Sequence, residues 1–107
     1  MSVDEIEVLG LTPQNLEDIN PRLIITSITP FGLSGPYKHF ESTDIVTYAL
    51  SGLMYHSGDS DREPLRNVLN QSFYVSGINA AVATTAALFQ RLTSCIGQGV
   101  EVSVIEC

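Results

Sequence analysis

Hydrophobic positions divide the chain into segments with two different spacings. Residues 22–28, RLIITSI, are β-branched and almost continuously apolar, which is typical of a strand covered on both faces in a parallel sheet. Residues 99–105, GVEVSVI, alternate valine with polar residues, the period-two pattern of a strand with one covered face. Two strands are therefore predicted, separated by most of the chain.

A short helix is predicted before the first strand. Thr12 can accept hydrogen bonds from the free amides of a first helical turn, and Pro13 has the fixed φ that suits that turn. Asn20 and Pro21 follow LEDI and end the helix there.

Two further helices are predicted between the strands. One starts near residues 42–43 and runs through DIVTYALSGLM, so that Asp44 falls in its first turn. The other begins around residues 70–72 and ends near Ser94. The order helix, strand, helix, helix, strand predicts an α/β fold.

The last of these helices has no polar side. Apolar residues from Ala80 to Phe89 occupy nearly its whole circumference, and a helix that is apolar all round must be enclosed on every side. Because a chain of 107 residues forms only one modest core, we expect the cover to come from a second copy, as a homodimer, or from sequence absent from this chain. The alternative is a compact domain in which Asn79, Thr84 and Thr85 form a wet edge.

Composition restricts the partners. Twelve acidic and five basic side chains give a net charge of −7, so we expect neither nucleic acid nor an anionic membrane surface to bind. The most apolar run, residues 78–89, is shorter than the roughly 20 residues that span a bilayer, and the acid-rich start lacks the pattern of a signal peptide. A cytoplasmic location is expected. Cys95 and Cys107 have no CxxC or paired-histidine spacing, so no metal site is predicted.

Common catalytic motifs do not fit this sequence. FGLSGP has Pro36 where a nucleophile elbow needs its second glycine. GQGVEV has too few glycines for a dinucleotide loop, and no Walker lysine is present. His39 and His56 are single histidines in loop positions, which is typical of solvated side chains.

Three separated blocks, in this order, resemble one family. INPRLIITSITPFGLSGPY, STDIVTYALSGLMYHSG and SGINAAVATTAALFQRLTSCIGQGVEVSV are similar to the middle of the class III CoA-transferases, the group of formyl-CoA transferase and carnitine CoA-transferase. The resemblance covers nearly the whole chain. It implies that residues 1–107 are a single partial domain, the central part of a Rossmann-like large domain with a long buried alanine-rich helix.

The resemblance also implies a chemistry. In this family an aspartate attacks an acyl-CoA thioester, and CoA then passes to a carboxylic acid through covalent intermediates on that carboxylate. Coenzyme A, as acyl-CoA, and carboxylic acids are therefore the expected small molecules, without a metal. The family places the aspartate four residues before the glycine that matches Gly77, and here that position holds Phe73, whose ring has no lone pair for the attack.

Four residues are candidates for a site. Asp44 matches an acid near the reacting centre of the transferases, although an aspartate in a first helical turn is equally explained by the helix dipole. Asn70, Gln71 and Ser72 stand at a helix start, where free amides attract anions, and they would orient a substrate carboxylate or phosphate. The simpler interpretation is that Asn70 or Ser72 caps the helix, with Phe73 and the next residue packed in the core.

The sequence therefore supports two hypotheses about function. In the first, the chain is a segment or subunit of a CoA-transferase, not competent alone because Phe73 replaces the nucleophile. In the second, it is a non-catalytic CoA-binding or assembly module derived from the same scaffold.

Overall fold

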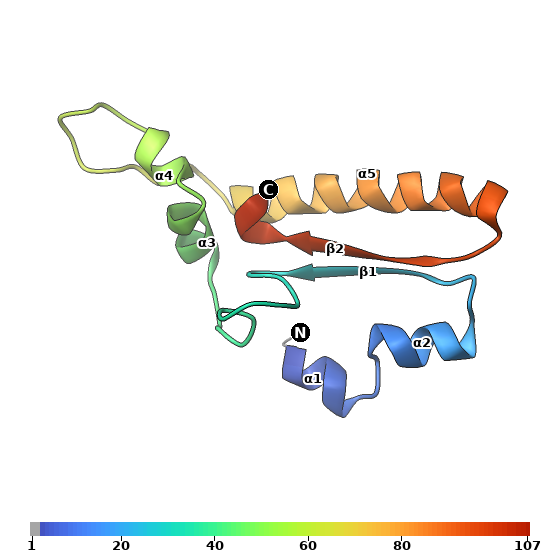
Figure 1. Ribbon diagram of the computed structural model, residues 1–107. Coiled ribbons are helices and arrows are strands. Elements are labelled where there is room, and N and C mark those ends of the chain that lie inside the picture. The colour runs from blue at the N-terminus through green and yellow to red at the C-terminus, as the bar shows by residue number, and fades with distance from the viewer. Residues whose placement is uncertain (1–2) are drawn as a thin grey trace.

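Two parallel strands and one long helix form the centre of the structure, a computed structural model that describes residues 3–107 (Figure 1). Strand β1 (Ile24–Thr29) pairs in parallel with β2 (Gln98–Ser103), and Thr29 lies opposite Ser103. Helix α5 (Gln71–Ser94) runs along both strands. The two strands and the long helix are confirmed close to their predicted bounds.

A threonine pair joins the long helix to the sheet. Thr84 Oγ1 and Thr26 Oγ1 lie 2.6 Å apart, and the Thr84 hydroxyl also donates to the carbonyl of Ala80 at 2.7 Å. Thr84 is half-buried against β1, so it does not belong to the wet edge of the alternative compact domain. The side chain of Thr85, by contrast, is exposed.

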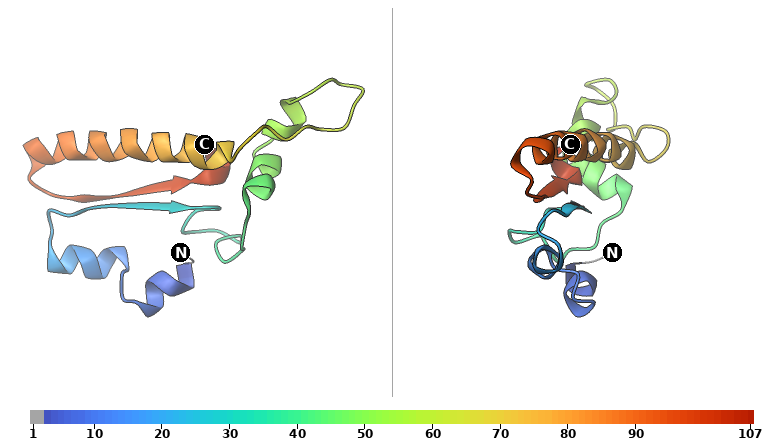
Figure 2. Two further views of the ribbon diagram at one scale, coloured as in Figure 1. Left: turned by 180° about the vertical axis from the view of Figure 1, so that it is seen from behind. Right: turned by 90° about the vertical axis from the view of Figure 1, so that its right-hand side faces the viewer.

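The N-terminal helices lie on the other side of β1 from α5 (Figures 1 and 2). Helix α2 (Pro13–Ile19) begins as predicted, and Thr12 Oγ1 accepts a hydrogen bond from the Asn15 amide at 3.4 Å. Helix α1 (Val3–Val8) was not expected, since its six residues carry neither a capping residue nor a full apolar period. No residue of α2 is buried in this chain.

The predicted helix through DIVTYALSGLM is two helices. Helix α3 (Asp44–Leu50) ends before Gly52, which adopts a left-handed conformation with φ of 84°, and α4 (Leu53–His56) follows. This conformation is open to glycine at little cost and interrupts the helical hydrogen bonds. The predicted second strand is also shorter, because residues Val104–Glu106 form a 3-10 turn, η1.

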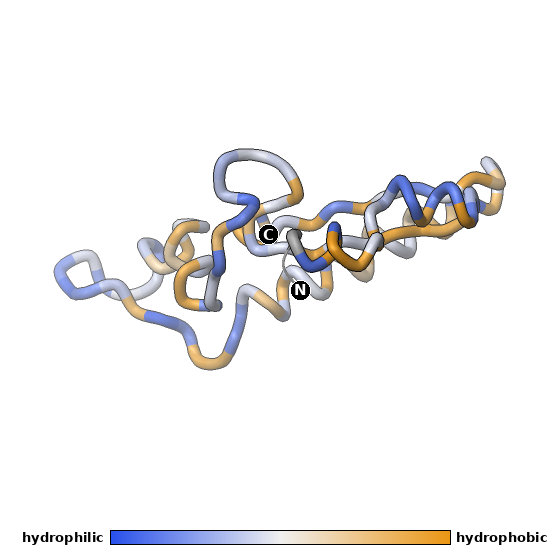
Figure 3. Tube along the Cα trace, turned by 90° about the horizontal axis from the view of Figure 1, so that it is seen from below, coloured by the Kyte–Doolittle hydropathy of each residue, from blue (hydrophilic) through white to orange (hydrophobic). Residues whose placement is uncertain are grey.

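The chain leaves much of its apolar surface uncovered. Its radius of gyration is 16.4 Å, whereas a compact domain of this length has about 13 Å. Apolar segments are spread along the trace and do not gather in one centre (Figure 3). Within the described residues, the buried hydrophobic side chains are Tyr48, Ala80, Ala87, Val102 and Val104.

Only one line of α5 is buried in this chain. It consists of Ser72, Ser76, Ala80 and Ala87, which face the sheet, η1 and α3. Ile78, Val82 and Phe89 on the remaining surface are exposed. Any enclosure of the whole helix therefore comes from outside these residues.

Candidate functional site

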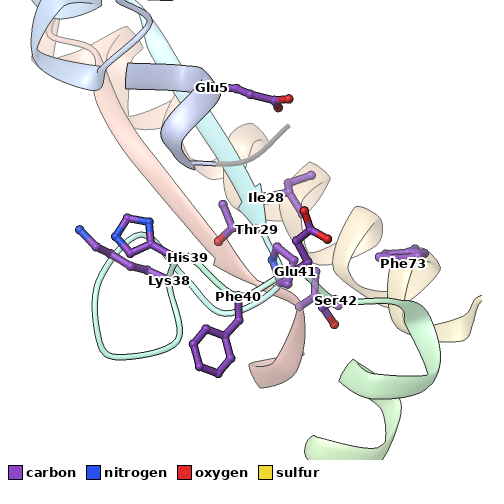
Figure 4. A pocket seen from close by; sticks show the side chains of 11 residues that line it. Glu5, Ile28, Thr29, Lys38, His39, Phe40, Glu41, Ser42 and Phe73 are labelled. Atoms are coloured by element: carbon purple, nitrogen blue, oxygen red, sulfur yellow. The ribbon is translucent and has the colours of Figure 1, made fainter. Parts of the chain in front are cut away.

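The carboxyl ends of both strands and the first turn of α5 meet at one end of the structure (Figure 1). Ligands of open α/β sheets bind in the crevice outside the carboxyl ends of the strands. A pocket of about 540 Å³ lies there, and we call it the strand-end pocket (Figure 4). Its lining residues are Glu5, Ile28, Thr29, Pro30, Lys38, His39, Phe40, Glu41, Ser42, Phe73 and Val104.

Phe73 forms one wall of this pocket. It stands in the first turn of α5, on the far side of the pocket from Lys38 and His39 in Figure 4. Its side chain is 46% exposed and that of Tyr74 is 61% exposed, so the expectation that both pack in the core is wrong. The position at which the resemblance expects a nucleophile therefore faces the cavity, but it carries a phenyl ring.

Thr29 is a member of the pocket that sequence reasoning missed. The residue is 4% exposed, and its hydroxyl oxygen has no hydrogen-bond partner among residues 3–107. Leaving such a group without a partner costs roughly 1–3 kcal/mol. The Ser103 hydroxyl, opposite in the sheet, is equally buried and unpartnered within the same residues. The sequence offered one signal for these two residues, which is their place at the end of a strand: Thr29 is the last residue of β1 and Ser103 is the last residue of β2.

Asp44 anchors the start of α5 from a different helix. Its Oδ1 accepts hydrogen bonds from the backbone amide of Ser72 at 3.3 Å and from the Ser72 hydroxyl. Its Oδ2 lies 3.4 Å from Arg66 Nη2. Thr47 Oγ1 donates to Ser72 Oγ at 3.1 Å and completes the cluster. The buried carboxylate thus satisfies a free amide of the first turn and meets the positive end of the helix dipole.

The contacts of Asp44 bear on the simpler interpretation of residues 70–72, in which Asn70 or Ser72 caps the helix. Asn70 is the N-cap residue of α5, but its side chain does not cap the helix. Instead, Asn70 Oδ1 accepts a hydrogen bond from Arg66 Nη2 at 3.3 Å, while Gln71 Nε2 donates to the Val68 carbonyl at 3.1 Å. The capping oxygen comes from Asp44, which no local pattern could show. The substrate-binding role of Asn70, Gln71 and Ser72 and the catalytic role of Asp44 stay predictions.

The loop after β1 is tied to β2. The backbone amide of Leu33 donates to Glu101 Oε1, and a second, polar pocket of about 320 Å³ lies beside this contact. Its lining residues are Phe31, Gly32, Ser34, Glu101, Ser103 and Glu106. Within the described part of the chain, no three His, Cys, Asp or Glu residues gather as metal ligands would.

Comparison with known proteins places this geometry in a family. The family model for "CoA-transferase family III" matches residues 1–107, and the chain belongs to that family. It is 37% identical over 101 residues to a subunit, BbsE, of succinyl-CoA:(R)-benzylsuccinate CoA-transferase from Thauera aromatica. It is 32% identical over 103 residues to succinate–glutarate CoA-transferase from Agrobacterium fabrum. These matches cover 94% and 96% of this chain.

A solved structure has the same fold. The crystal structure of a CAIB/BAIF family protein from Brucella suis matches 100% of this chain with a TM-score of 0.93 and 30% identity, which confirms the α/β fold. The matched part is 28% of that protein, and the chain spans about a quarter of the length of the two curated relatives.

The fold also explains the apolar helix. The 24 residues of α5 extend beyond the apolar run, and by length and composition alone they are long enough to cross a membrane. In the structure, however, α5 packs along both strands of the sheet, in an arrangement shared with the Brucella protein. Packing of a helix on a parallel sheet is typical of α/β proteins.

Proposed function

We propose that this chain is the central α/β part of a CoA-transferase that moves CoA from an acyl-CoA to a carboxylic acid. The match to CoA-transferase family III over residues 1–107 is the observation that carries the proposal. The strand-end pocket supports it, because it opens where α/β folds hold ligands and is bounded by the first turn of α5. Coenzyme A and a carboxylic acid are the proposed ligands, and a cytoplasmic location is proposed with them.

This part of the protein does not supply the covalent nucleophile at the position that the resemblance implies. Transfer through a carboxylate needs an oxygen lone pair that attacks the thioester carbonyl, and Phe73 offers none. Asp44 is held by contacts to both of its oxygens. Covalent transfer therefore requires a carboxylate other than that of Asp44, and we propose that it comes from another part of the protein or from a second chain.

The alternative is a non-catalytic CoA-binding or assembly module. The phenyl ring of Phe73 on the wall of the pocket favours it. The relative from Thauera aromatica is named as a subunit, which supports a role beside a second chain. A homodimer, or the remainder of the transferase, would cover the exposed surface of α5.

Exchange of Phe73 tests the proposal. The full-length protein is incubated with an acyl-CoA, digested, and searched by mass spectrometry for acyl adducts that hydroxylamine removes. We expect no adduct on residues 1–107 of the wild type and an acyl anhydride at position 73 in Phe73→Asp. There the introduced carboxylate oxygen bonds to the acyl carbon, the C–S bond breaks, and CoA leaves as the thiolate. Phe73→Asn is the matched control, since it has the same shape without the nucleophile.

The remaining outcomes separate the two functions. CoA transfer by the wild type, with the acyl adduct on a peptide outside residues 1–107, supports the transferase. Binding of CoA without any transfer supports the module. The proposal is wrong if calorimetry detects no binding of CoA at millimolar concentration and Phe73→Asp forms no acyl adduct.

A further inference from the structure

The side of α5 that faces away from the sheet carries an ordered row of residues. Its members recur at alternating intervals of three and four residues, and we call them the outer seam: Val75, Ile78, Val82, Thr85, Phe89 and Leu92. All six are exposed in this chain, and the five apolar ones are between 36% and 76% exposed. At about 100° per residue, the outer seam lies opposite the buried line of α5. The packing among residues 3–107 therefore does not explain it.

The spacing of the outer seam indicates what kind of element covers it. Apolar residues at intervals of three and four keep a narrow line of side chains in contact with a second helix that crosses at about 20°. Neither a loop nor a lipid surface requires such a period. Thr85 also fits a contact with a helix, because its hydroxyl already donates to the Ala81 carbonyl at 2.7 Å and presents no unpaired group to a partner.

The residues beside the outer seam carry no charge. On its two sides lie Tyr74, Ala81 and Leu88, and Asn79, Ala86 and Thr93. Arg91 is the one charged residue of α5, and its Nη1 donates to the Arg22 carbonyl at 3.0 Å, away from the seam. Charges beside a seam select the partner and its orientation when two separate chains pair. A seam without such charges relies on a partner that is already held nearby.

The outer seam is also short. It extends from Val75 to Leu92, about 26 Å at 1.5 Å per residue, which is less than the three to four heptads that are typical of coiled coils. A helix of the same protein needs no longer seam, because it is present at a high effective concentration. The chain spans about a quarter of the length of the two curated relatives, so proteins of this family have a long remainder that can supply a helix.

We propose that the outer seam packs lengthwise against a single amphipathic helix from the part of the same protein that lies outside residues 1–107. The apolar residues of that helix recur at intervals of three and four and fill the spaces between the seam residues. This inference concerns the assembly of the protein and goes beyond the proposed function, because it holds whether or not the protein transfers CoA.

Photochemical cross-linking of the full-length protein tests the inference. In three separate variants, benzoylphenylalanine replaces Ile78, Thr85 or Leu92, which are spaced about 10.5 Å apart along α5. We expect each variant to form a cross-link within one chain, to a peptide outside residues 1–107. The three cross-linked positions should be about seven residues apart in sequence. A strand along the seam would instead give positions about three residues apart, because a strand rises about 3.3 Å per residue.

A pair of lysine variants provides a matched control that needs no cross-linker. Val82 and Gln90 are both exposed positions of α5 in this chain, but only Val82 belongs to the outer seam. We expect Val82→Lys to lower the melting temperature of the full-length protein by several degrees, because it places a charge in the covered seam. Gln90→Lys should leave the melting temperature nearly unchanged.

Three results of the cross-linking would overturn the inference: cross-links that join two chains, cross-linked positions without helical spacing, or no cross-link at all. Equal melting temperatures of the two lysine variants would overturn it as well. CoA binding and transfer are measured separately on the wild type, so a failure here does not count against the proposed function.

Discussion

At the scale of single residues, the anchoring of α5 by Asp44 is the contact that most affects the site. The carboxylate is buried and fixes the amide of Ser72, which is the residue directly before Phe73. The sequence predicts that Asp44 lies in the first turn of a helix, where an acid is favourable. It does not predict that the acid serves the first turn of a second helix, 28 positions away, because that pairing depends on how α3 and α5 pack.

Removing this carboxylate should destabilise the protein. Asp44→Ala leaves the Ser72 amide without its acceptor, and loss of a helix cap costs about 1 kcal/mol, within roughly 0.5–2 kcal/mol. Urea unfolding of the full-length protein measures the change in the free energy of unfolding. Asp59→Ala is the control, since Asp59 pairs with Arg62 on the surface, with both side chains more than 70% exposed, and such pairs contribute little. Equal effects of the two substitutions would show that Asp44 does not anchor α5.

At the scale of elements, the connection between α5 and β2 sets how the helix lies on the sheet. Helix α5 ends at Ser94, and its C-cap residue Cys95 has a left-handed conformation with φ of 58°. Gly97 then passes close to the end of the segment before β1. The Gly97 amide donates to the Pro21 carbonyl at 2.8 Å. A Cβ at Gly97 would lie 1.9 Å from the Leu23 carbonyl oxygen, so only glycine permits this approach.

A methyl group at this connection should separate the two chain segments. Gly97→Ala forces backbone movement, and overpacking of this kind costs about 1–3 kcal/mol. Gly99→Ala is a matched control two residues further along, inside β2, because a Cβ there meets nothing within 4 Å. We expect a clear fall in melting temperature for Gly97→Ala and a much smaller change for Gly99→Ala. Similar melting temperatures for both variants would contradict the steric argument.

The elements differ in how far the sequence predicts them. The strands β1 and β2 and the helix α5 follow from long apolar patterns, which local context cannot easily override. The break between α3 and α4 depends on one glycine, and a single glycine inside a helical pattern does not by itself predict the end of a helix, because it is tolerated at a cost of about 1 kcal/mol. Similarly, the pocket residues Thr29 and Phe73 come from distant parts of the chain, and only the packing of α5 on the strands brings them together.

At the scale of the whole molecule, the chain is too open to be a complete globule. Its extents are 54 × 31 × 21 Å, and its two-stranded sheet has two unpaired edges among the described residues. Two-stranded sheets are marginally stable in water without further strands or cover. The remainder of a family III transferase would supply that cover.

The isolated 107-residue chain should therefore behave differently from the full-length protein. We expect it to bind the hydrophobic dye ANS and to associate at micromolar concentration, because exposed apolar patches promote association. The full-length protein should do neither beyond its own defined oligomer. Dye fluorescence and sedimentation velocity measure both properties. An isolated chain that stays monomeric, ignores the dye and unfolds cooperatively would show that it needs no cover.

The sequence by itself determined the α/β class, the positions of the strands and the long helix, and the family, because apolar periodicity and local motifs are properties of neighbouring residues. Tertiary structure alone decided which oxygen caps α5, which side of that helix is buried, and that Thr29 and Phe73 share a pocket. These features depend on contacts between residues far apart in the chain, and such contacts exist only once the helix has packed on the sheet.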